Sequence, residues 1–335
     1  MKVMTVPDLL EKAIVLIDIG AVGSPPSHWL PLKDRIHLIG FEPNQEECKK
    51  LNEAGCGYLE SEFLPFAIGE KNENRTFYIT KYHECCSLLK PNLEWLHRFD
   101  YGSFFDLNRT IEVKTLSLDS IEKLSDLRVD ALKIDAQGNE LPILKGAKSI
   151  LDHVFLIEVE TGLHKNYENE TTFEELCPFL KEKGFTCMEL FTQPTQKRNN
   201  VASKWNSSKG QAMACESIWV RDLIKCEADF LHSLSRSDFL SILSLCWLFG
   251  YSDYALELLD NQILGSLLEE DVKKALGKEE TWLKPVLEAD SASRLTQFLG
   301  YLSHFLSTPA RRNFYTHLPK LAEKPNILKR ALGKE

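Results

Sequence analysis

Two features near the N-terminus could together bind a nucleoside. An apolar run, Ala13 to Ile17, leads directly into the glycine turn Asp18-Ile19-Gly20-Ala21-Val22-Gly23. A second apolar run, Ile36 to Phe41, ends at Glu42, about twenty residues after that turn. Glycines let the backbone approach a ligand closely, and the Glu42 carboxylate can accept hydrogen bonds from both ribose hydroxyls. Either feature alone could be a tight connection or a solvated strand end, but together they favour a nucleoside site.

The glycine turn departs from the full dinucleotide-binding fingerprint. Its spacing is not Gly-x-Gly-x-x-Gly, and Pro25 and Pro26 follow it closely. Prolines at these positions argue against an immediate long helix whose N-terminus would hold a pyrophosphate. A nicotinamide-dependent oxidoreductase, which uses the same kind of sheet, is therefore a weaker enzyme interpretation.

The elements that must position these residues alternate between strands and helices. Helices are expected to begin after Asn44 and near Asp119 and Asn139. Further strands are predicted at Pro65–Ile68, Thr76–Thr80, Ile111–Thr115, Ala131–Ile134 and Val154–Glu160. This alternation predicts an α/β fold with a parallel, doubly wound, Rossmann-like sheet, in which ligands bind at the carboxyl ends of the strands.

The chain is expected to end in a different kind of structure. A helix from Thr172 to Lys183 precedes two strands, Phe185–Phe191 and Met213–Val220, which are predicted to form an antiparallel edge. From about Leu223 the apolar residues recur only at helical spacing. We therefore divide the chain into a Rossmann-like domain, 1–222, and a small all-helical domain, 223–335. The helical part is expected to be a separately folded appendage that contacts a protein partner or associates with itself.

The composition favours a cytoplasmic protein. The 335 residues carry a formal net charge of -9, which disfavours nucleic-acid binding by phosphate neutralisation. Nine cysteines are present without a Cys-x-x-Cys pair, so reduced thiols are expected. The N-terminus has no signal-type sequence, and the run ending at Gly20 is too short to cross a bilayer, so no membrane insertion is expected.

Several motifs, taken in order, resemble those of FkbM-type methyltransferases. They are Asp18-Ile19-Gly20-Ala21, Gly40-Phe41-Glu42-Pro43, Cys86-Ser87-Leu88-Leu89, Thr115-Leu116-Ser117-Leu118-Asp119-Ser120, Leu132-Lys133-Ile134-Asp135-Ala136-Gln137-Gly138-Asn139-Glu140 and Ile143-Leu144-Lys145-Gly146-Ala147. The resemblance spans roughly Ile14 to Phe191, and the segment around Asp135 is its most distinctive part.

This resemblance implies a class I methyltransferase fold with S-adenosylmethionine as methyl donor. The acceptor is expected to be an oxygen atom of a small molecule, sugar or glycan. By the same resemblance, Asp18 and Gly20 frame the methionine part of the donor, Glu42 holds the ribose, and other residues lie near the adenine. The full expected donor set is Asp18, Gly20, Ala21, Gly23, Phe41, Glu42, Pro43, Ala67, Ile68 and Asp135.

The candidates for catalysis are Asp135, Glu158 and His164. Asp135 follows a predicted strand and can bind the donor's amino group or orient the acceptor, although it could simply cap the next helix. A hydroxyl acceptor benefits from a base that removes its proton, and Glu158 or His164 could do so. Glu160 is a further acceptor-side carboxylate, or a solvated one. The spacing of these groups does not predict a required metal.

The insertion between strands and the helical C-terminal part each allow two interpretations. The stretch Tyr82 to Ser87, in an insertion between strands, could wall the acceptor pocket or simply pack. The whole chain could also be a nucleoside-binding module that lacks catalysis and acts through its helical C-terminal part. Retention of Asp18, Glu42 and Asp135 argues against that alternative.

Overall fold

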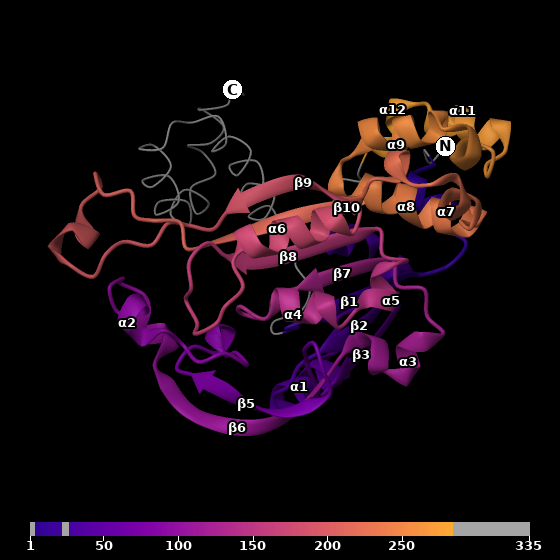
Figure 1. Cartoon of the computed structure of the whole chain (residues 1–335). Helices are drawn as coiled ribbons and strands as arrows, with labels where there is room; N and C mark the ends of the chain where they lie inside the picture. The colour runs from indigo at the N-terminus through magenta and orange to yellow at the C-terminus, as the bar shows by residue number, and fades with distance from the viewer. Residues whose placement is uncertain (1–3, 22–26, 284–335) are drawn as a thin grey trace, which may run out of the picture. The chain divides into compact units, whose positions relative to one another are not determined.

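The computed structural model describes residues 4–21 and 27–283 of the chain. A seven-stranded sheet in this part has the strand order β3-β2-β1-β7-β8-β10-β9 (Figure 1). Its strands are β1 (Ile14–Ile19), β2 (Ile36–Phe41), β3 (Glu60–Leu64), β7 (Ala131–Ile134), β8 (Leu156–Gly162), β9 (Phe185–Thr192) and β10 (Ala214–Arg221). Strands β3, β2, β1, β7 and β8 are parallel, whereas β10 is antiparallel to β8 and β9. The predicted parallel sheet and its antiparallel edge are therefore confirmed.

Three of the predicted strands belong to a second, smaller sheet. Strands β4 (Ala67–Ile68), β6 (Leu107–Leu116) and β5 (Glu73–Thr80) pair in that order, with β5 antiparallel to β6. Strand β6 is largely exposed and β5 is mostly half-buried, unlike β1, which is buried on both faces. The third strand of the main sheet, β3, was not predicted, because it is a polar edge strand that buries mainly Phe63.

Helices cover both faces of the main sheet. The face formed by Val15, Ile17 and their neighbours packs against η5 (Leu118–Ser120), α3 (Glu122–Ser125), α4 (Glu140–Lys145), α5 (Lys148–Leu151) and α6 (Phe173–Glu182). The opposite face of the sheet contains Ile14, Leu16 and the residues beside them. It packs against η1 (Val6–Leu9), η2 (Ser27–Arg35), α1 (Gln45–Ala54) and the C-terminal helices. Side chains alternate along each strand, which is why one buried strand supplies both cores.

The C-terminal helices are α7 (Ala228–His232), α8 (Arg236–Phe249), α9 (Ser252–Asp260), α10 (Gln262–Gly265), α11 (Glu270–Leu276) and α12 (Glu279–Trp282), and η7 (Leu223–Lys225) leads into them. Helix α8 begins with a capping box between Ser235 and Asp238 and ends at Gly250 in the left-handed conformation. It is buried around almost its whole circumference, because it lies between the sheet and the other helices. These helices share one hydrophobic core with β1, β2 and β10, and residues 211–283 belong to the same compact unit as residues up to 199.

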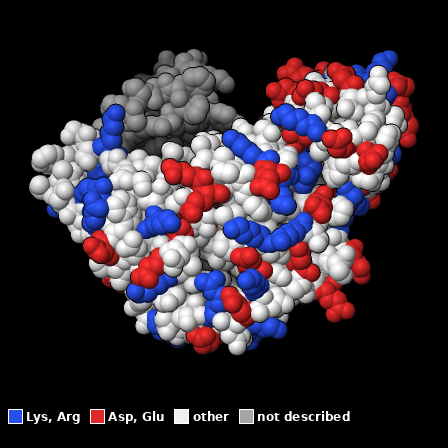
Figure 2. Space-filling model, viewed as in Figure 1, with Lys and Arg blue, Asp and Glu red and all other residues white. Residues whose placement is uncertain are grey.

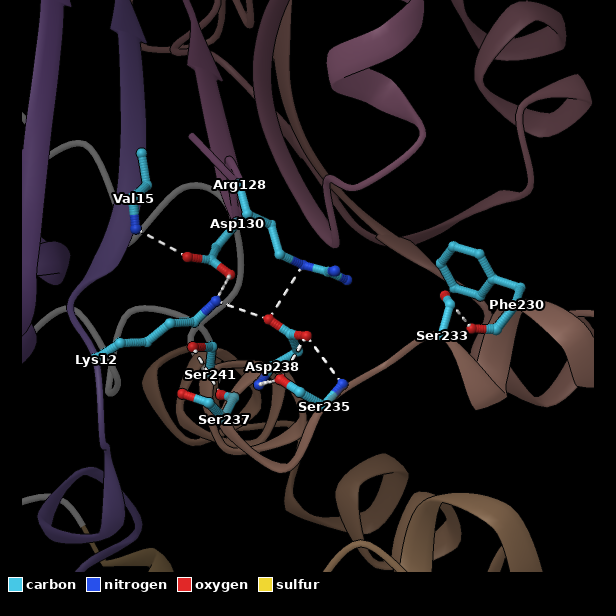
Figure 3. Close-up of polar contacts among 10 residues, drawn as sticks. All are labelled: Lys12, Val15, Arg128, Asp130, Phe230, Ser233, Ser235, Ser237, Asp238 and Ser241. Atoms are coloured by element: carbon cyan, nitrogen blue, oxygen red, sulfur yellow. Dashed lines mark hydrogen bonds and ion pairs between the residues drawn. The ribbon is translucent and has the colours of Figure 1, made fainter. Parts of the chain in front are cut away.

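A buried ionic network joins α8 to the amino-terminal edge of the sheet (Figure 3). Lys12 Nζ lies 2.7 Å from Asp238 Oδ1 and 3.9 Å from Asp130 Oδ1. Arg128 Nε lies 3.1 Å from the same Asp238 oxygen. Asp130 also accepts a hydrogen bond from the backbone N–H of Val15 at 2.9 Å. The network thus connects β1, the residue before β7 and the first turn of α8.

The surface of the protein carries charges of both signs. Lysines, arginines and acidic residues are interspersed over the face that Figure 2 shows. All nine cysteines are free. Among the described residues, no helix is both long and apolar enough to cross a membrane. Residues 200–210, with η6 (Val201–Lys204), fall in a separate compact unit from the sheet.

Candidate functional site

A cavity opens at the carboxyl ends of β1, β2 and β7. It contains about 680 Å³ of empty space, part of which is open to solvent. Its lining is formed by Ile19, Gly20, Phe41, Glu42, Pro43, Phe66, Ala67, Ile68, Phe77, His83, Glu84, Cys86, Leu88, Asp135, Ala136 and Gln137. The expected donor residues Gly20, Phe41, Glu42, Pro43, Ala67, Ile68 and Asp135 therefore meet at one place, the edge of the sheet where open α/β folds bind ligands.

Gly20 forms the floor of this cavity between the ends of two strands. Its backbone has φ of +81°, and its N–H donates to the carbonyl of Phe41 at 3.2 Å. A β-carbon at Gly20 would lie 1.9 Å from the carbonyl oxygen of Asp135. Only glycine fits this position, since a side chain would be both strained and in collision.

Glu42 supplies a buried carboxylate at the end of β2. The residue is 2% exposed, and its Oε1 accepts a hydrogen bond from the N–H of Asn44 at 2.7 Å. Burial raises the pKa of Glu42 to about 7, while the Asn44 hydrogen bond and the nearby His83 oppose the rise. Such a group accepts hydrogen bonds from ligand hydroxyls in a shielded environment, where each bond is stronger than in water.

Apolar residues form a slot beside Glu42. Phe41 comes from β2, Phe66 and Ile68 from around β4, and Phe77 and Leu88 from β5 and the segment after it. These side chains come from separate parts of the chain and converge on one cavity. A slot of this kind suits the flat faces of a purine base.

The insertion after β5 closes one side of the cavity. Helix η3 (His83–Cys85) brings His83 and Glu84 to the lining, and Cys86 follows. The Nδ1 atom of His83 is buried and has no hydrogen-bond partner among the described residues. The stretch Tyr82 to Ser87 thus walls a pocket that Glu42 also lines.

The loop after β7 is fixed by side-chain contacts on both sides. Gln137 has φ of +52°, and its Nε2 donates to Asp135 Oδ1 at 3.0 Å. The hydroxyl of Tyr167 donates to Gln137 Oε1 at 2.8 Å, and Ser87 Oγ donates to the Gln137 carbonyl at 2.7 Å. Glu140 Oε1 accepts from the N–H groups of Ala136 and Gly138. Asp135 is therefore held in place by its neighbours, as functional loops require.

Asp18 and Ala21 are not among the residues that line the cavity. Asp18 is fully buried beneath it, with Oδ1 3.3 Å from Lys133 Nζ. Burial raises the pKa of Asp18 although Lys133 opposes the rise. Ala21 is buried in the core between the sheet and its helices. Gly23 lies outside the described residues.

Glu158 and His164 also lie away from the lining. Glu158 is 1% exposed, and its Oε2 accepts a hydrogen bond from Trp29 Nε1 at 2.7 Å and lies 3.0 Å from His28 Nε2. His164 Nε2 lies 2.6 Å from Gln211 Nε2, and its ring packs on Trp95 with centroids 5.4 Å apart. The structure thus joins Glu158 to η2, and His164 to the insertion and the segment before β10.

Sequence reasoning did not single out most of the apolar and insertion residues of the site. Phe66 and Phe77 lie in no motif, because an apolar side chain that lines a slot looks the same in sequence as one that fills a core. His83 and Glu84 were noticed only as members of a polar and aromatic stretch. Their convergence on Glu42 depends on the folding of the second sheet. Among the described residues, no group of three or more His, Cys, Asp or Glu side chains is arranged to hold a metal ion.

Comparison with known proteins agrees with this geometry. The family model described as the methyltransferase FkbM domain matches residues 22–187. None of the curated proteins matches the chain by sequence. The fold and the site therefore define an S-adenosylmethionine-dependent methyltransferase domain. Within that class, residues 22–187 belong to the FkbM methyltransferase family.

Solved structures similar to this chain include three methyltransferases, each at low identity. An FkbM methyltransferase of Methylobacillus flagellatus is 12% identical, with a TM-score of 0.32, and the match covers 61% of this chain and 43% of that one. The magnesium protoporphyrin IX methyltransferase of Synechocystis, solved with bound S-adenosylmethionine, is 9% identical over 63% and 71% of the chains, with a TM-score of 0.32. An rRNA methylase of Streptococcus thermophilus is 9% identical over 64% and 91%, with a TM-score of 0.30. The chain thus spans less than half the length of the Methylobacillus protein.

Proposed function

We propose that this protein transfers the methyl group of S-adenosylmethionine to a hydroxyl oxygen of a small molecule, sugar or glycan. The single observation that supports this best is the cavity that combines the buried Glu42 carboxylate, an apolar slot and the bare backbone of Gly20. An adenosyl ligand matches each of these three parts.

The donor set follows from the chemistry of the lining. Glu42 accepts hydrogen bonds from the ribose hydroxyls, and Phe41, Pro43, Ala67 and Ile68 flank the adenine. Gly20 lets the methionine part pass over the backbone, beside Asp135. When bound, the donor supplies an electrophilic methyl group on a sulfonium. The chain's own task is to hold this group in line with the acceptor and to exclude water.

Asp18 has an indirect part in this proposal. It lies below the cavity and pairs with Lys133, so it fixes the end of β7 on which Asp135 stands. Its two carboxylate oxygens are buried without a hydrogen bond in the described part of the chain. An acid that is this strongly desolvated is tolerated because Lys133 lies beside it.

Calorimetry with three ligands tests the donor assignment. S-adenosylhomocysteine and S-adenosylmethionine are expected to bind at micromolar concentrations, equivalent to about -8 kcal/mol, and NAD much more weakly. Tighter binding of NAD than of S-adenosylhomocysteine would favour the oxidoreductase interpretation instead. Binding without transfer of a labelled methyl group to any fractionated metabolite or glycan would favour the non-catalytic module.

A further inference from the structure

A row of carboxylates extends from the donor cavity across two neighbouring strands. The register pairs Ile134 with Val159, so Asp135, one residue further on, stands level with Glu160. Glu160 is in turn paired directly with Glu216 of β10. Residues level with one another in a sheet project from the same face, so these three carboxylates point to one side. Because Asp135 lines the cavity, the row begins at the donor site and runs away from it.

Glu158, two residues before Glu160 on β8, influences the ionisation of Glu216, which is the end of this row away from the donor cavity. Although burial opposes it, contacts with His28 and Trp29 hold the pKa of Glu158 below its ordinary value. These contacts use Oε2, and the buried Oε1 has no hydrogen-bond partner among the described residues. Burial and the Glu158 charge raise the pKa of Glu216 to about 7. Glu158 is therefore kept ionised by its neighbours, and its charge favours the protonated form of Glu216.

Glu160 is in a different situation, because it is only partly buried and stands between Asp135 and Glu216. Its Oε2 accepts one hydrogen bond, from Gln193 Nε2 at 2.9 Å. Burial raises its pKa, the charges of Asp135, Glu216 and Glu170 raise it further, and the charge of Lys133 opposes the rise. Lys133 is itself engaged by Asp18 at 3.3 Å.

We propose that this row is the acceptor half of the site, and that Glu160 removes the proton of the acceptor hydroxyl. The proposal rests on the function proposed above. As the acceptor oxygen bonds to the donor methyl carbon, the carbon–sulfur bond breaks and its electron pair stays on sulfur. The hydroxyl proton passes to the Glu160 carboxylate, which leaves a methyl ether and S-adenosylhomocysteine. Atoms and charge are conserved without a further reactant.

The row also sets the charge of the acceptor. At a pH where Asp135, Glu160 and Glu216 are ionised, they repel phosphates and carboxylates, and the nearby Lys133 is already engaged by Asp18. Their oxygens accept hydrogen bonds from hydroxyl and amino groups. Neutral sugars and amino sugars fit this site, and sugar phosphates and RNA do not. The burial of Glu160 and the charges of Asp135 and Glu216 raise its pKa to about 8, which places it near the pH at which a general base is most effective.

The test uses the full chain and defined acceptors. Labelled S-adenosylmethionine is incubated with methyl glycosides of neutral hexoses, with hexosamines and with hexose 6-phosphates. Wild-type protein is compared with Glu160→Gln and with Glu182→Gln, which removes an exposed carboxylate on α6. Calorimetry with S-adenosylhomocysteine and thermal melting check that each variant is folded and keeps its donor site.

The wild-type protein should label neutral or amino glycosides in preference to the phosphates. Its rate should rise with pH through about 8 as Glu160 ionises, and Glu160→Gln should lose this rise together with about 100-fold or more of the rate. Donor affinity should be unchanged in both variants. Preference for phosphates, or a Glu160→Gln variant with wild-type rate and pH profile, would overturn the inference. A wild-type protein that binds the donor yet labels no acceptor contradicts the proposed function itself, and the inference falls with it.

Discussion

The backbone at Gly20 touches the backbone at Asp135, so the glycine turn after the first strand meets the most distinctive family motif at one point. The β-carbon that any other residue would place at position 20 lies 1.9 Å from the Asp135 carbonyl oxygen. The N–H of Asp135 in turn donates to the Ile19 carbonyl at 2.9 Å. Donor-side and acceptor-side residues are thus fixed to each other by main-chain contacts rather than by side chains.

Replacing Gly20 by alanine should disrupt the donor site. The substitution forces the ends of β1 and β7 apart, so we expect calorimetry to show S-adenosylhomocysteine affinity lowered by at least about tenfold, or 1.4 kcal/mol. Gly250→Ala is a matched control, since Gly250 has φ of +83° and no neighbour within 4 Å of its β-carbon position. It should cost about 1 kcal/mol of stability and leave donor affinity intact. Equal donor affinity in Gly20→Ala and wild type would show that the close contact is not required.

Glu42 should control donor binding through its ionisation. Loss of charge-assisted ribose hydrogen bonds in Glu42→Ala should weaken S-adenosylhomocysteine by about 1.5 to 3 kcal/mol. Glu53→Gln, an exposed change on α1, serves as its control. If affinity is unchanged in Glu42→Ala, then Glu42 is not part of the site.

The same residue predicts how donor affinity depends on pH. The pKa of Glu42 is raised to about 7. The ionised carboxylate, which accepts the ribose hydrogen bonds, is therefore the major form of Glu42 at pH 8 and the minor form at pH 6. Affinity for S-adenosylhomocysteine should therefore fall as the pH is lowered from 8 to 6, by up to about tenfold. Calorimetry at several pH values measures this, and Glu42→Gln should remove most of the dependence. An affinity that rises toward pH 6 would contradict the assignment.

The ionic network around Asp238 should stabilise the fold and contribute nothing to the donor site. Asp238→Ala removes contacts with Lys12 and Arg128 and the cap of α8, so the free energy of unfolding in urea should fall by about 1.5 to 3 kcal/mol. Although burial opposes it, hydrogen bonds from Lys12 and Ser235 lower the pKa of Asp238 to about 2. The contribution is therefore complete above about pH 4 and is lost as the pH falls toward 2. Glu257→Gln, exposed on α9, should change neither property.

The C-terminal helices should be needed for folding of the sheet. A chain that ends at residue 222 leaves Ile14, Leu16 and Leu38 without their cover, because these side chains share a core with α8. We expect this shortened chain to lose its cooperative thermal transition and its S-adenosylhomocysteine binding. A chain that ends at residue 283 keeps every helix that the structure describes and should retain both. If the 222-residue chain is folded and binds the donor, the helical part is a separable domain, as its sequence alone suggests.

Local sequence was sufficient to predict the strands and turns that bear the motifs. The uninterrupted apolar run that forms β1 indicates a strand buried on both faces, and the glycine turn after it needs a backbone conformation that the residue type reveals. The order of strands and helices then places Glu42 and Asp135 at the same sheet edge, where both line the cavity. These inferences succeed because the spacing of apolar residues, the order of elements along the chain and the conformations open to glycine can all be read from local sequence.

Only the tertiary structure decided which groups share the site. Glu158 and Glu160 are two residues apart on one strand, yet Glu158 is covered by His28 and Trp29 while Glu160 stands beside Asp135. In the same way, His83 reaches the cavity of Glu42 from the insertion after β5, and α8 covers β1 from more than two hundred residues away in the chain. Burial, partner and pKa depend on which side chains fold against each residue, and long-range packing of this kind leaves no local pattern in the sequence.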